Sequence, residues 1–455
     1  MPELDHLLEK YNQPVPRYTS YPTVPFWKEK IDTQQWKKSF CDQFQKVNHP
    51  EGISLYLHLP FCESLCTYCG CNKKITTHHD VEEPYLDSIL REFRLYLDLA
   101  GSAPLIREMH LGGGTPTFFS PENLERLITG ITKNGKVHPQ HEFSIEGHPN
   151  NTSRDHLQTL YKLGFRRISF GVQDLDPQVQ YVINRIQPFE KVKEVTEIAR
   201  SAGFTSVNFD LIYGLPLQTR ASIENTFRQI LSLRPDRIAF YSYAHTPWVS
   251  RGQRLFDESD LPTAGDKLRL YLLGRQILLE GGYYDIGMDH FALPQDDLYM
   301  SWQNGNVHRN FMGYTTHPTT FLLGLGVSSI SDTGNAYAQN EKTVHNYYER
   351  INRGELAVQK GYFLSEEDKS FRNYILDLAC RGKTILQPRH LELFREYCFP
   401  QLQDLEKDGL IHWDEDTVEV TMKGRNFLRN ICRAFDLHLL RATELQKKSL
   451  FSKAI

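Results

Sequence analysis

The stretch Pro60-Phe61-Cys62-Glu63-Ser64-Leu65-Cys66-Thr67-Tyr68-Cys69-Gly70-Cys71 places four cysteines within ten residues. The first three, Cys62, Cys66 and Cys69, follow the spacing C-x₃-C-x₂-C, and an aromatic residue precedes the third. Three thiolates on one short loop can ligate three irons of a [4Fe–4S] cluster. The fourth iron then stays open to a substrate or a cofactor. The spacing therefore predicts a reactive iron–sulfur site.

Two other uses of these cysteines remain as alternatives. A structural zinc site usually divides its ligands between two C-x₂₋₄-C pairs far apart in the chain, whereas these cysteines share one loop. A disulfide is less favoured, because the remaining cysteines are scattered singly, as in proteins of a reducing cytosol. Those remaining cysteines are Cys41, Cys380, Cys398 and Cys432.

The composition is that of an ordinary globular protein. The 455 residues are 40% hydrophobic and 24% charged, which is enough for a large catalytic domain and a smaller one. No apolar run has membrane-spanning length, and the polar N-terminus is unlike a signal or transit peptide. The formal net charge of −4 does not indicate nucleic-acid or lipid binding. We therefore expect a cytoplasmic protein without nucleic-acid or membrane partners, and a monomer, because no coiled-coil or repeat pattern is present.

Short apolar runs alternate with helical patterns along the middle of the chain. The runs predicted as strands are Ile53 to Leu59, Glu108 to Leu111, Glu142 to Ile145, Arg167 to Val172, Ser206 to Tyr213 and Arg237 to Tyr243. Helical patterns between them cover residues 86–97, 155–163, 190–202, 222–233 and 265–279. Continuous apolar strands separated by helices indicate a parallel sheet covered by helices. We predict an α/β fold, a partial (β/α)₆ barrel.

Unusual polar and glycine residues follow the ends of these predicted strands. The cysteine loop follows the first strand, and Gly112-Gly113-Gly114-Thr115-Pro116-Thr117 follows the second. The other four strands end near Glu146, Gln173, Asp210 and Ala244-His245. Barrel enzymes carry their active sites at the carboxyl ends of the strands, so we expect all of these residues at one mouth.

The pattern differs at the two ends of the chain. Residues 1–50 are predicted to be an N-terminal arm with no core of its own, and residues 51–361 to be the barrel with its substrate-site extensions. Residues 362–455 are predicted to be a small, mostly helical, winged-helix-like C-terminal domain. Its balanced charge favours a packing or lid role over DNA binding. Its predicted segments are helices from Ser365 to Arg381 and from His390 to Asp408, a hairpin of Ile411 to Trp413 with Val418 to Thr421, and a helix from Lys423.

With these motifs in place, the chain resembles a radical S-adenosylmethionine (SAM) enzyme, and in detail the oxygen-independent coproporphyrinogen III oxidases of heme synthesis. The resemblance covers almost the whole chain. The matched blocks are Pro16 to Thr23, Cys69 to Lys73, Gly112 to Thr117, Gly171 to Asp174, Asp210 to Pro216, Gly287 to Phe291, His308 to Phe311, Gly313 to Thr316 and Leu323 to Ser328.

The resemblance implies a radical mechanism. Cys62, Cys66 and Cys69 would ligate a [4Fe–4S] cluster, and SAM on its open iron would be cleaved to a 5′-deoxyadenosyl radical. That radical would start the oxidative decarboxylation of two propionates of coproporphyrinogen III to vinyl groups, giving protoporphyrinogen IX. Two propionates require two SAM molecules, in agreement with two SAM sites. An electron donor such as a flavodoxin or ferredoxin is implied, and no side-chain base is required.

The resemblance also implies roles for individual residues. The SAM on the cluster would contact Tyr56, Gly113, Glu146, Ala244 and Ile330. The second SAM would contact Tyr68, Gly114, Thr115, Gln173, Arg185 and Asp210. Arg17 and Arg309 are the candidates for binding substrate carboxylates, because arginine binds carboxylates in a bidentate manner.

Two features leave a role open. Cys71 is typical of the family but is not needed as a cluster ligand. Gly147-His148-Pro149 follows Glu146 where the family carries an apolar residue and Asp before the proline. We expect His148 to be a structural histidine with its hydrogen bonds satisfied.

Two related functions remain as alternatives. Heme-binding chaperones of the same superfamily generally lack a cysteine at the Cys71 position and carry a His-Asn-x-x-Tyr-Trp motif. Here Cys71 is present, and the segment from His345 to Arg350 matches only the first two letters of that motif. Radical SAM heme-degrading methyltransferases are disfavoured by the intact arm around Arg17 and the block from Gly287 to Phe291.

Overall fold

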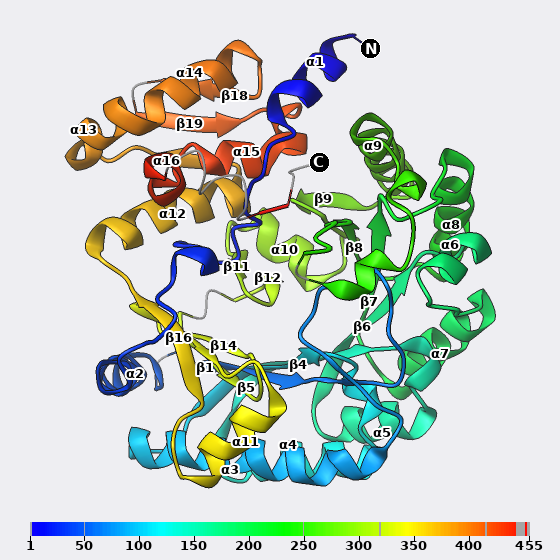
Figure 1. Cartoon of the computed structure of the whole chain (residues 1–455), viewed down its shortest axis with the longest axis vertical. Helices are drawn as coiled ribbons and strands as arrows, with labels where there is room; N and C mark the ends of the chain where they lie inside the picture. The colour runs from blue at the N-terminus through cyan, green and yellow to red at the C-terminus, as the bar shows by residue number, and fades with distance from the viewer. Residues whose placement is uncertain are drawn as a thin grey trace.

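Six neighbouring parallel strands form the centre of the fold, in the order β1-β4-β5-β6-β7-β8. The computed structural model in Figure 1 describes residues 2–49, 51–248, 250–317, 320–414, 416–442 and 451–452. The six strands are β1 (Ile53–Leu59), β4 (Leu105–Gly113), β5 (Lys136–Gly147), β6 (Phe165–Gln173), β7 (Ser206–Tyr213) and β8 (Arg237–Ser242). Each run predicted as a strand is one, and the predicted partial barrel is confirmed.

Helices cover the outer face of these strands (Figure 1). They are α3 (Glu82–Ala100), α4 (Pro121–Thr132), α5 (Arg154–Lys162), α6 (Pro177–Val182), α7 (Phe189–Ala202), α8 (Arg220–Leu233) and α9 (Ala264–Glu280). Polar side chains fix where several of them begin. Ser153 accepts a hydrogen bond from the backbone nitrogen of His156 at the start of α5, and Thr219 accepts one from that of Ser222 at the start of α8.

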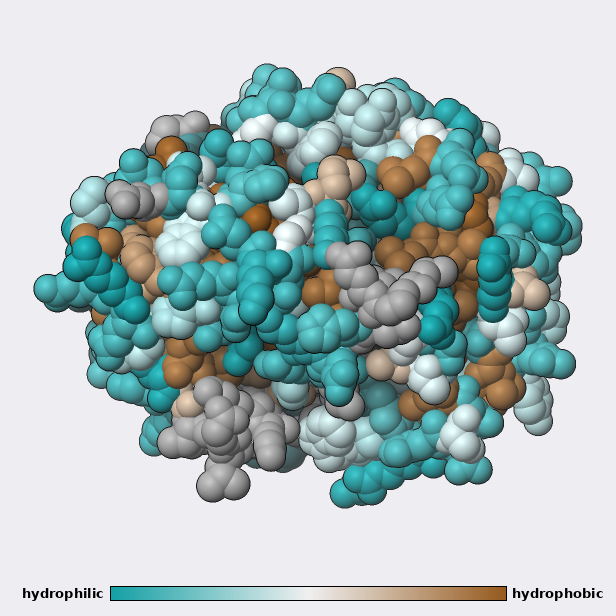
Figure 2. Space-filling model, turned by 90° about the horizontal axis from the view of Figure 1, so that it is seen from above, coloured by the Kyte–Doolittle hydropathy of each residue, from teal (hydrophilic) through white to brown (hydrophobic). Residues whose placement is uncertain are grey.

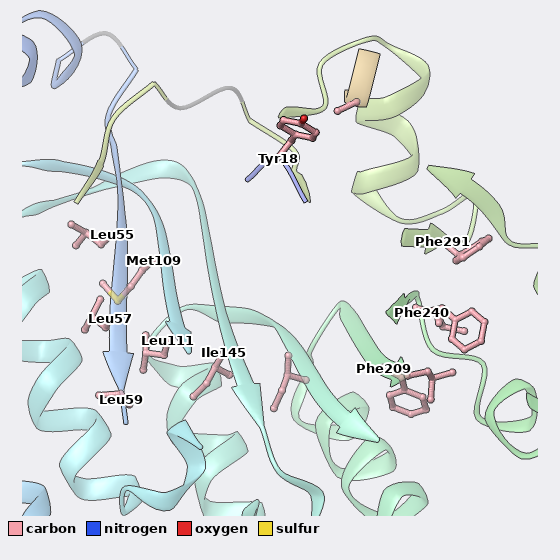
Figure 3. Packing of buried hydrophobic residues seen from close by; sticks show 14 of the residues in the cluster. Tyr18, Leu55, Leu57, Leu59, Met109, Leu111, Ile145, Phe209, Phe240 and Phe291 are labelled. Atoms are coloured by element: carbon pink, nitrogen blue, oxygen red, sulfur yellow. The ribbon is translucent and has the colours of Figure 1, made fainter. Parts of the chain in front are cut away.

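The parallel strands have an apolar outer face and a polar inner face. Leu55, Leu57 and Leu59 of β1 are completely buried and belong to the main hydrophobic core, together with residues of the neighbouring strands (Figure 3). Tyr56 and His58 lie between them and line a cavity. The continuous apolar runs predict strands that are apolar on both faces. In the structure only the outer face is apolar. Successive side chains point to opposite sides of a strand, and the inside of this barrel carries hydrogen-bonded polar groups.

Ion pairs are part of that polar inner face. Arg167 of β6 lies 2.9 Å from the carboxylate of Glu142 on β5. Arg237 of β8 lies 2.5 Å from the carboxylate of Asp296, and both of these side chains are buried. Buried charges require such partners, so the inside of the barrel is held together by charge as well as by packing.

Shorter strands extend the sheet on both sides and were not predicted. On one side, β13 (Leu322–Leu325) pairs with β1, followed by β14 (Ile330–Asp332), β15 (Ala336–Asn340) and β16 (Val358–Phe363). On the other side, β10 (His290–Ala292) and β9 (Tyr284–Gly287) continue from β8. The connections contain β2 (Phe61–Cys62) with β3 (Lys74–Ile75), α10 (Asp297–Gln303), β11 (His308–Asn310) with β12 (Gly313–Thr315), and α11 (Val344–Asn352).

The N-terminal residues pack against two other parts of the molecule. They contain α1 (Pro2–Tyr11) and α2 (Thr33–Val47). Trp36 and Phe40 of α2 are buried in the main core. The Tyr11 hydroxyl donates a 2.5 Å hydrogen bond to Asp408 in the C-terminal domain, near which α1 is drawn in Figure 1. We retain the division after residue 50 as a proposal.

The C-terminal residues form helices around a small sheet. The elements are α12 (Glu366–Arg381), β17 (Lys383–Ile385), α13 (Leu391–Leu393), α14 (Phe399–Lys407), β18 (Ile411–Trp413), β19 (Thr417–Val420), α15 (Leu428–Arg433) and α16 (Leu437–Arg441). The single helix predicted from His390 to Asp408 is interrupted by a π-helical turn over Phe394–Cys398. That turn precedes Pro400, which has no backbone N–H to donate. The final helix is likewise divided, into α15 and α16. The boundary at residue 362 also remains a proposal.

The surface shown in Figure 2 is mostly hydrophilic, with separate hydrophobic areas. Among large hydrophobic side chains in the described residues, Tyr181, Leu255 and Met422 are the most exposed, and they belong to different segments of the chain. No helix in the described ranges combines the length and the apolar character that crossing a membrane requires.

Candidate functional site

The three motif cysteines lie on the loop that follows β1, next to the ends of other parallel strands. The Thr115 hydroxyl donates a hydrogen bond of 3.3 Å to the Cys62 sulfur. The Arg185 guanidinium donates one of 3.5 Å to the Cys66 sulfur. These contacts connect the cysteine loop to the glycine run after β4 and to the segment after β6.

One cavity of about 260 Å³, here called the cysteine cavity, lies between these strand ends. Of the residues predicted to bind the cluster or SAM, those that line it are Cys62, Cys66, Cys69, Tyr68, Gly113, Gly114, Thr115, Glu146, Gln173, Arg185 and Asp210. Tyr241 of β8 also lines it, so the end of every one of the six parallel strands contributes. The strand order places these distant residues around one space.

Two of the other predicted SAM contacts lie in an adjoining cavity. Tyr56 and Ile330 line this cavity of about 560 Å³, which shares Gly113 and Glu146 with the cysteine cavity. Ala244 follows β8 and lines neither. The structure thus brings every predicted SAM contact except Ala244 to two adjoining cavities.

The glycine run approaches the cysteine loop closely. Gly113 has a φ of +115°, and a Cβ atom there would lie 2.6 Å from the His58 ring. A Cβ atom at Gly114 would lie 2.5 Å from the carbonyl carbon of Pro60, and the Gly114 nitrogen donates a 2.8 Å hydrogen bond to the Leu59 carbonyl. Only residues without a Cβ atom allow this approach.

Glu146 contributes a carboxylate to both cavities. It accepts hydrogen bonds from the Gly113 nitrogen at 3.2 Å and from the His110 ring at 3.3 Å. Burial raises the pKa of Glu146, but His110, the Gly113 nitrogen and His58 together lower it, and the net pKa lies below its ordinary value. Glu146 is therefore an anion that can bind a cationic group such as an amine.

Asp210 has the opposite electrostatic tendency. Burial, together with the charge of Glu146, raises the pKa of Asp210 to about 7. Ser169 and Asn208 each donate a 3.0 Å hydrogen bond to its carboxylate. A carboxyl group with this pKa can either accept or donate a hydrogen bond, which suits the hydroxyl groups of a ligand.

Arg185 belongs to the wall of the cysteine cavity rather than to the surface. One of its Nη atoms donates a 2.5 Å hydrogen bond to the Gly171 carbonyl, and the other approaches Cys66. Its Nε atom is buried and has no hydrogen-bond partner among the described residues. Arg185 therefore keeps capacity for an anionic group.

His148 lines the cysteine cavity, and its role as a structural histidine stays a prediction. Its Nδ1 atom accepts a hydrogen bond from the backbone nitrogen of Asn150 at 3.1 Å. Burial lowers the pKa of His148 to about 2. The ring is therefore neutral and carries its proton on Nε2.

Two histidines of the site were missed by the sequence analysis. His58 lies 3.1 Å from the Tyr56 hydroxyl and 2.9 Å from the Asn72 carbonyl. His110 lies 2.7 Å from the Ser144 hydroxyl and contacts Glu146 through its other nitrogen. A period-two reading of β1 and β4 would have placed both histidines on the same face as Tyr56.

Arg17 and Arg309 lie together, but outside the cysteine cavity. They line a separate cavity of about 50 Å³ next to the C-terminal domain. Arg309 donates a 3.4 Å hydrogen bond to the Arg17 carbonyl. The Arg17 guanidinium lies 5.8 Å from the ring of Tyr241, which lines the cysteine cavity.

The donor set fits an iron–sulfur cluster better than a single metal ion. Within the described ranges, no three His, Cys, Asp or Glu side chains converge as a mononuclear site requires. All eight cysteines lie in the described part of the chain and are unbridged. Three thiols face one cavity, and two of their sulfurs accept hydrogen bonds, as cluster thiolates do.

Comparison with known proteins gives concordant results. The family model of the radical SAM superfamily matches residues 56–230. Curated relatives named oxygen-independent coproporphyrinogen III oxidase include one from Synechocystis sp., 39% identical over 99% of this chain and 97% of its own length. Another, from Escherichia coli K12, is 39% identical over 99% of this chain and 98% of its own. The solved coproporphyrinogen III oxidase of Escherichia coli, described as a radical SAM enzyme, has a TM-score of 0.86 and 38% identity, covering 93% of this chain and 98% of that one.

Proposed function

Because the chain belongs to the oxygen-independent coproporphyrinogen III oxidases of the radical SAM superfamily, we propose that it converts coproporphyrinogen III to protoporphyrinogen IX in heme biosynthesis. It is a radical SAM oxidoreductase, with a [4Fe–4S] cluster and SAM as cofactors. Two propionate side chains become vinyl groups, each by loss of one hydrogen atom from the β-carbon, of CO₂ and of one electron. The observation that carries this proposal is the convergence of the cysteine loop and the other five strand ends on one cavity.

Cys62, Cys66 and Cys69 are the proposed cluster ligands. When bound, the cluster and SAM together supply the radical that removes the hydrogen atom. The chain's own contribution is to provide thiolates. Burial raises the pKa of Cys62 to about 11, so cluster binding must displace its proton. The Cys71 thiol donates a hydrogen bond that lowers the pKa of Cys69, which gives Cys71 a supporting role.

Two groups of residues are proposed to hold the two SAM molecules. The first, around the anionic Glu146, would bind the SAM on the cluster, and its members are Tyr56, Gly113, Glu146, Ala244 and Ile330. The second would bind the other SAM, and its members are Tyr68, Gly114, Thr115, Gln173, Arg185 and Asp210. The carboxylate of Glu146 matches an amino group, and the unpartnered Nε of Arg185 matches a carboxylate.

Arg17 and Arg309 are the proposed substrate contacts. The substrate carries four carboxylates, and both arginines lie at the edge of the barrel beyond Tyr241. Their place outside the cysteine cavity suits binding of the substrate's periphery rather than of its reacting carbon.

The partners follow from the chemistry. Each vinyl group requires reductive activation of one SAM, so we propose a flavodoxin or ferredoxin as the electron donor. We further propose that the protein acts as a monomer in the cytoplasm, where its unbridged cysteines stay reduced.

The test is an anaerobic assay of cluster-reconstituted protein with SAM, a reductant and coproporphyrinogen III. We expect 5′-deoxyadenosine and a vinyl-bearing product by mass spectrometry, and neither from Cys66→Ala. Deoxyadenosine without a vinyl product would point to another substrate.

No feature of the site favours the heme-carrier alternative. His345, the residue that could ligate heme, lies on α11, where its side chain is 81% exposed and 3.4 Å from Glu349. Cys71, which such carriers generally lack, lines the cysteine cavity. If the protein with a verified cluster gave neither deoxyadenosine nor vinyl product and bound heme tightly, the carrier function would replace the proposed one.

A further inference from the structure

A second, smaller cavity lies where the N-terminal arm, the edge of the barrel and the C-terminal domain meet. We call it the arginine pocket, and its charged lining residues are Arg17, Asp289, Arg309, Arg425 and Arg429. Its volume of about 50 Å³ suits a small group such as a carboxylate and not a ring system.

Arg309 is incompletely hydrogen-bonded in this pocket. Only 4% of the residue is exposed, and its guanidinium lies 4.7 Å from the ring of Tyr314. Its Nη2 atom donates to the Arg17 carbonyl, but Nε and Nη1 have no hydrogen-bond partner among the described residues. Leaving buried charged donors unpaired is costly. Each of these two nitrogens can donate a charge-assisted hydrogen bond to a carboxylate oxygen.

The neighbouring arginines donate hydrogen bonds to main-chain carbonyls. Arg17 donates a 2.6 Å hydrogen bond to the Ser242 carbonyl. Arg429 donates to the carbonyls of Val15 and Pro16, the latter at 3.2 Å. A carbonyl satisfies a donor without neutralising its charge, so the pocket keeps an excess of positive charge.

The acids near the pocket do not balance that charge. Asp289 is the only carboxylate among the described lining residues, and it lies 2.7 Å from His290. Arg425 lies 3.8 Å from the Asp285 carboxylate, which also pairs with Arg275 at 2.9 Å, and donates a 2.9 Å hydrogen bond to the Asp285 carbonyl. Arg17 and Arg309 therefore have one carboxylate, that of Asp289, among the described residues that line the pocket with them.

A nearby lysine responds to the same positive field. Lys267 donates a 2.7 Å hydrogen bond to the Tyr243 carbonyl. Burial, and then the charges of Arg429 and Arg17, lower the pKa of Lys267 to about 7. An anion bound in the pocket would relieve this field.

The arginine pocket and the cysteine cavity lie close to each other at Tyr241. Tyr241 lines the cysteine cavity, and the Arg17 guanidinium lies 5.8 Å from its ring on the pocket side. A tetrapyrrole is wide enough to place one side chain at each site. A group anchored at Arg309 can thus orient another part of the same molecule toward the cysteines.

We propose that the arginine pocket binds a propionate that the reaction retains, so that Arg309, Arg17 and Arg429 anchor the substrate while a different propionate reacts. This inference rests on the proposed function. Ion pairing stabilises a carboxylate as an anion and so opposes the loss of CO₂ from it. A retained carboxylate is therefore the better occupant. The product keeps two of the four carboxylates, so the same pocket serves substrate and product.

The test uses porphyrins as stable probes of cluster-reconstituted protein. Protoporphyrin IX carries the two retained propionates, and its dimethyl ester carries none that is charged. We expect the wild type to bind the diacid at least about tenfold more tightly than the diester, the factor that a charge-assisted hydrogen bond contributes. Absorption titrations under anaerobic conditions measure both dissociation constants without any turnover.

Variants then assign the difference to the pocket. Arg309→Gln should weaken binding of protoporphyrin IX and of coproporphyrin III by the same factor and leave the diester unchanged. Arg309→Lys, which keeps the charge but not the planar guanidinium with its several donors, should recover part of the affinity. Arg395→Gln, at an exposed arginine of the C-terminal domain, is the matched control and should bind as the wild type does.

Three results would overturn the inference. Equal binding of the diacid and the diester by the wild type would show that no carboxylate is recognised. This comparison uses the wild type alone, so it does not depend on whether a variant folds. Unchanged binding by a folded Arg309→Gln would move the carboxylate elsewhere. An effect on coproporphyrin III alone would assign the pocket to a reacting propionate. Failure of the proposed function is read separately, from the anaerobic assay with SAM and coproporphyrinogen III, which would then give no vinyl product whatever the porphyrin affinities are.

Discussion

The distance between two backbone segments at Gly114 decides whether the glycine run can lie against the cysteine loop. We predict that Gly114→Ala disrupts the loop, because the new Cβ atom would lie 2.5 Å from the carbonyl carbon of Pro60, which cannot move aside as a flexible side chain can. Iron content after reconstitution should fall well below that of the wild type. Gly70→Ala, on the same loop with no heavy atom within 4 Å of the new Cβ, should retain its iron. Equal iron in the two variants would contradict the prediction.

The charge of Glu146 is a second property of a single residue with a measurable result. Glu146→Gln keeps the shape but removes the anion, so SAM should bind at least about tenfold more weakly, the loss of one charge-assisted contact. Equilibrium dialysis of reconstituted protein with labelled SAM measures this. Glu63→Gln is the control, because Glu63 lines the same cavity but is not among the proposed SAM contacts. An unchanged SAM affinity in Glu146→Gln would remove Glu146 from the proposed site.

For single residues, the sequence predicts sites that depend on local spacing but misses contacts between residues that only folding brings together. The spacing of Cys62, Cys66 and Cys69 is a local pattern and can be recognised directly. Arg185 has no such signal, since nothing in its neighbours shows that it contacts Cys66 across the cavity. Its place was inferred from family resemblance alone. The same holds for Arg309, whose unpartnered nitrogens are visible only in three dimensions.

The secondary-structure elements were predicted well where their apolar pattern is strong. All six parallel strands were found, but β5 begins at Lys136, before the predicted start at Glu142, because its first residues are largely polar and resemble a loop. The strands from β9 to β16 were missed, since they are short and their pairing depends on distant residues. The helix break before Pro400 arises because proline has no backbone N–H to donate. The periodicity of apolar residues carries no information about this missing donor.

The ion pair between β5 and β6 should make stability depend on pH. Burial raises the pKa of Glu142, but Arg167 and Arg237 outweigh it and lower the pKa from 4.5 to about 2. Because the folded pKa lies below the unfolded one, the contribution to stability is complete above pH 4.5 and is lost as the pH falls toward 2. This contribution is on the order of 3 kcal/mol.

Glu142→Gln isolates this contribution. Its free energy of unfolding in urea should lie below that of the wild type at neutral pH, and the gap should narrow as the pH is lowered toward about 3. Glu197→Gln, at an exposed position in the middle of α7, should show no such gap. A gap between wild type and Glu142→Gln that is independent of pH would contradict the ionic origin.

At the scale of the whole molecule, the N-terminal arm connects the barrel to the C-terminal domain. The Tyr18 hydroxyl donates a 3.0 Å hydrogen bond to Asp436, and both residues are buried. Tyr18→Phe should lower the free energy of unfolding by about 1–2 kcal/mol, because Asp436 loses a donor that it cannot replace with water. Tyr181→Phe, at a residue that is 77% exposed, should have no measurable effect. Equal unfolding curves for wild type and Tyr18→Phe would show that this connection contributes little.

The arginine pocket is lined by Arg17, Arg309 and Arg429, which are far apart in the sequence. The cysteines and the proposed SAM contacts all lie between residues 56 and 330. During translation the cysteines and all proposed SAM contacts are therefore added to the chain before Arg429. A chain interrupted between residues 330 and 429 contains the cysteines and every proposed SAM contact but lacks Arg429 of the arginine pocket. The order of translation thus places substrate capture last.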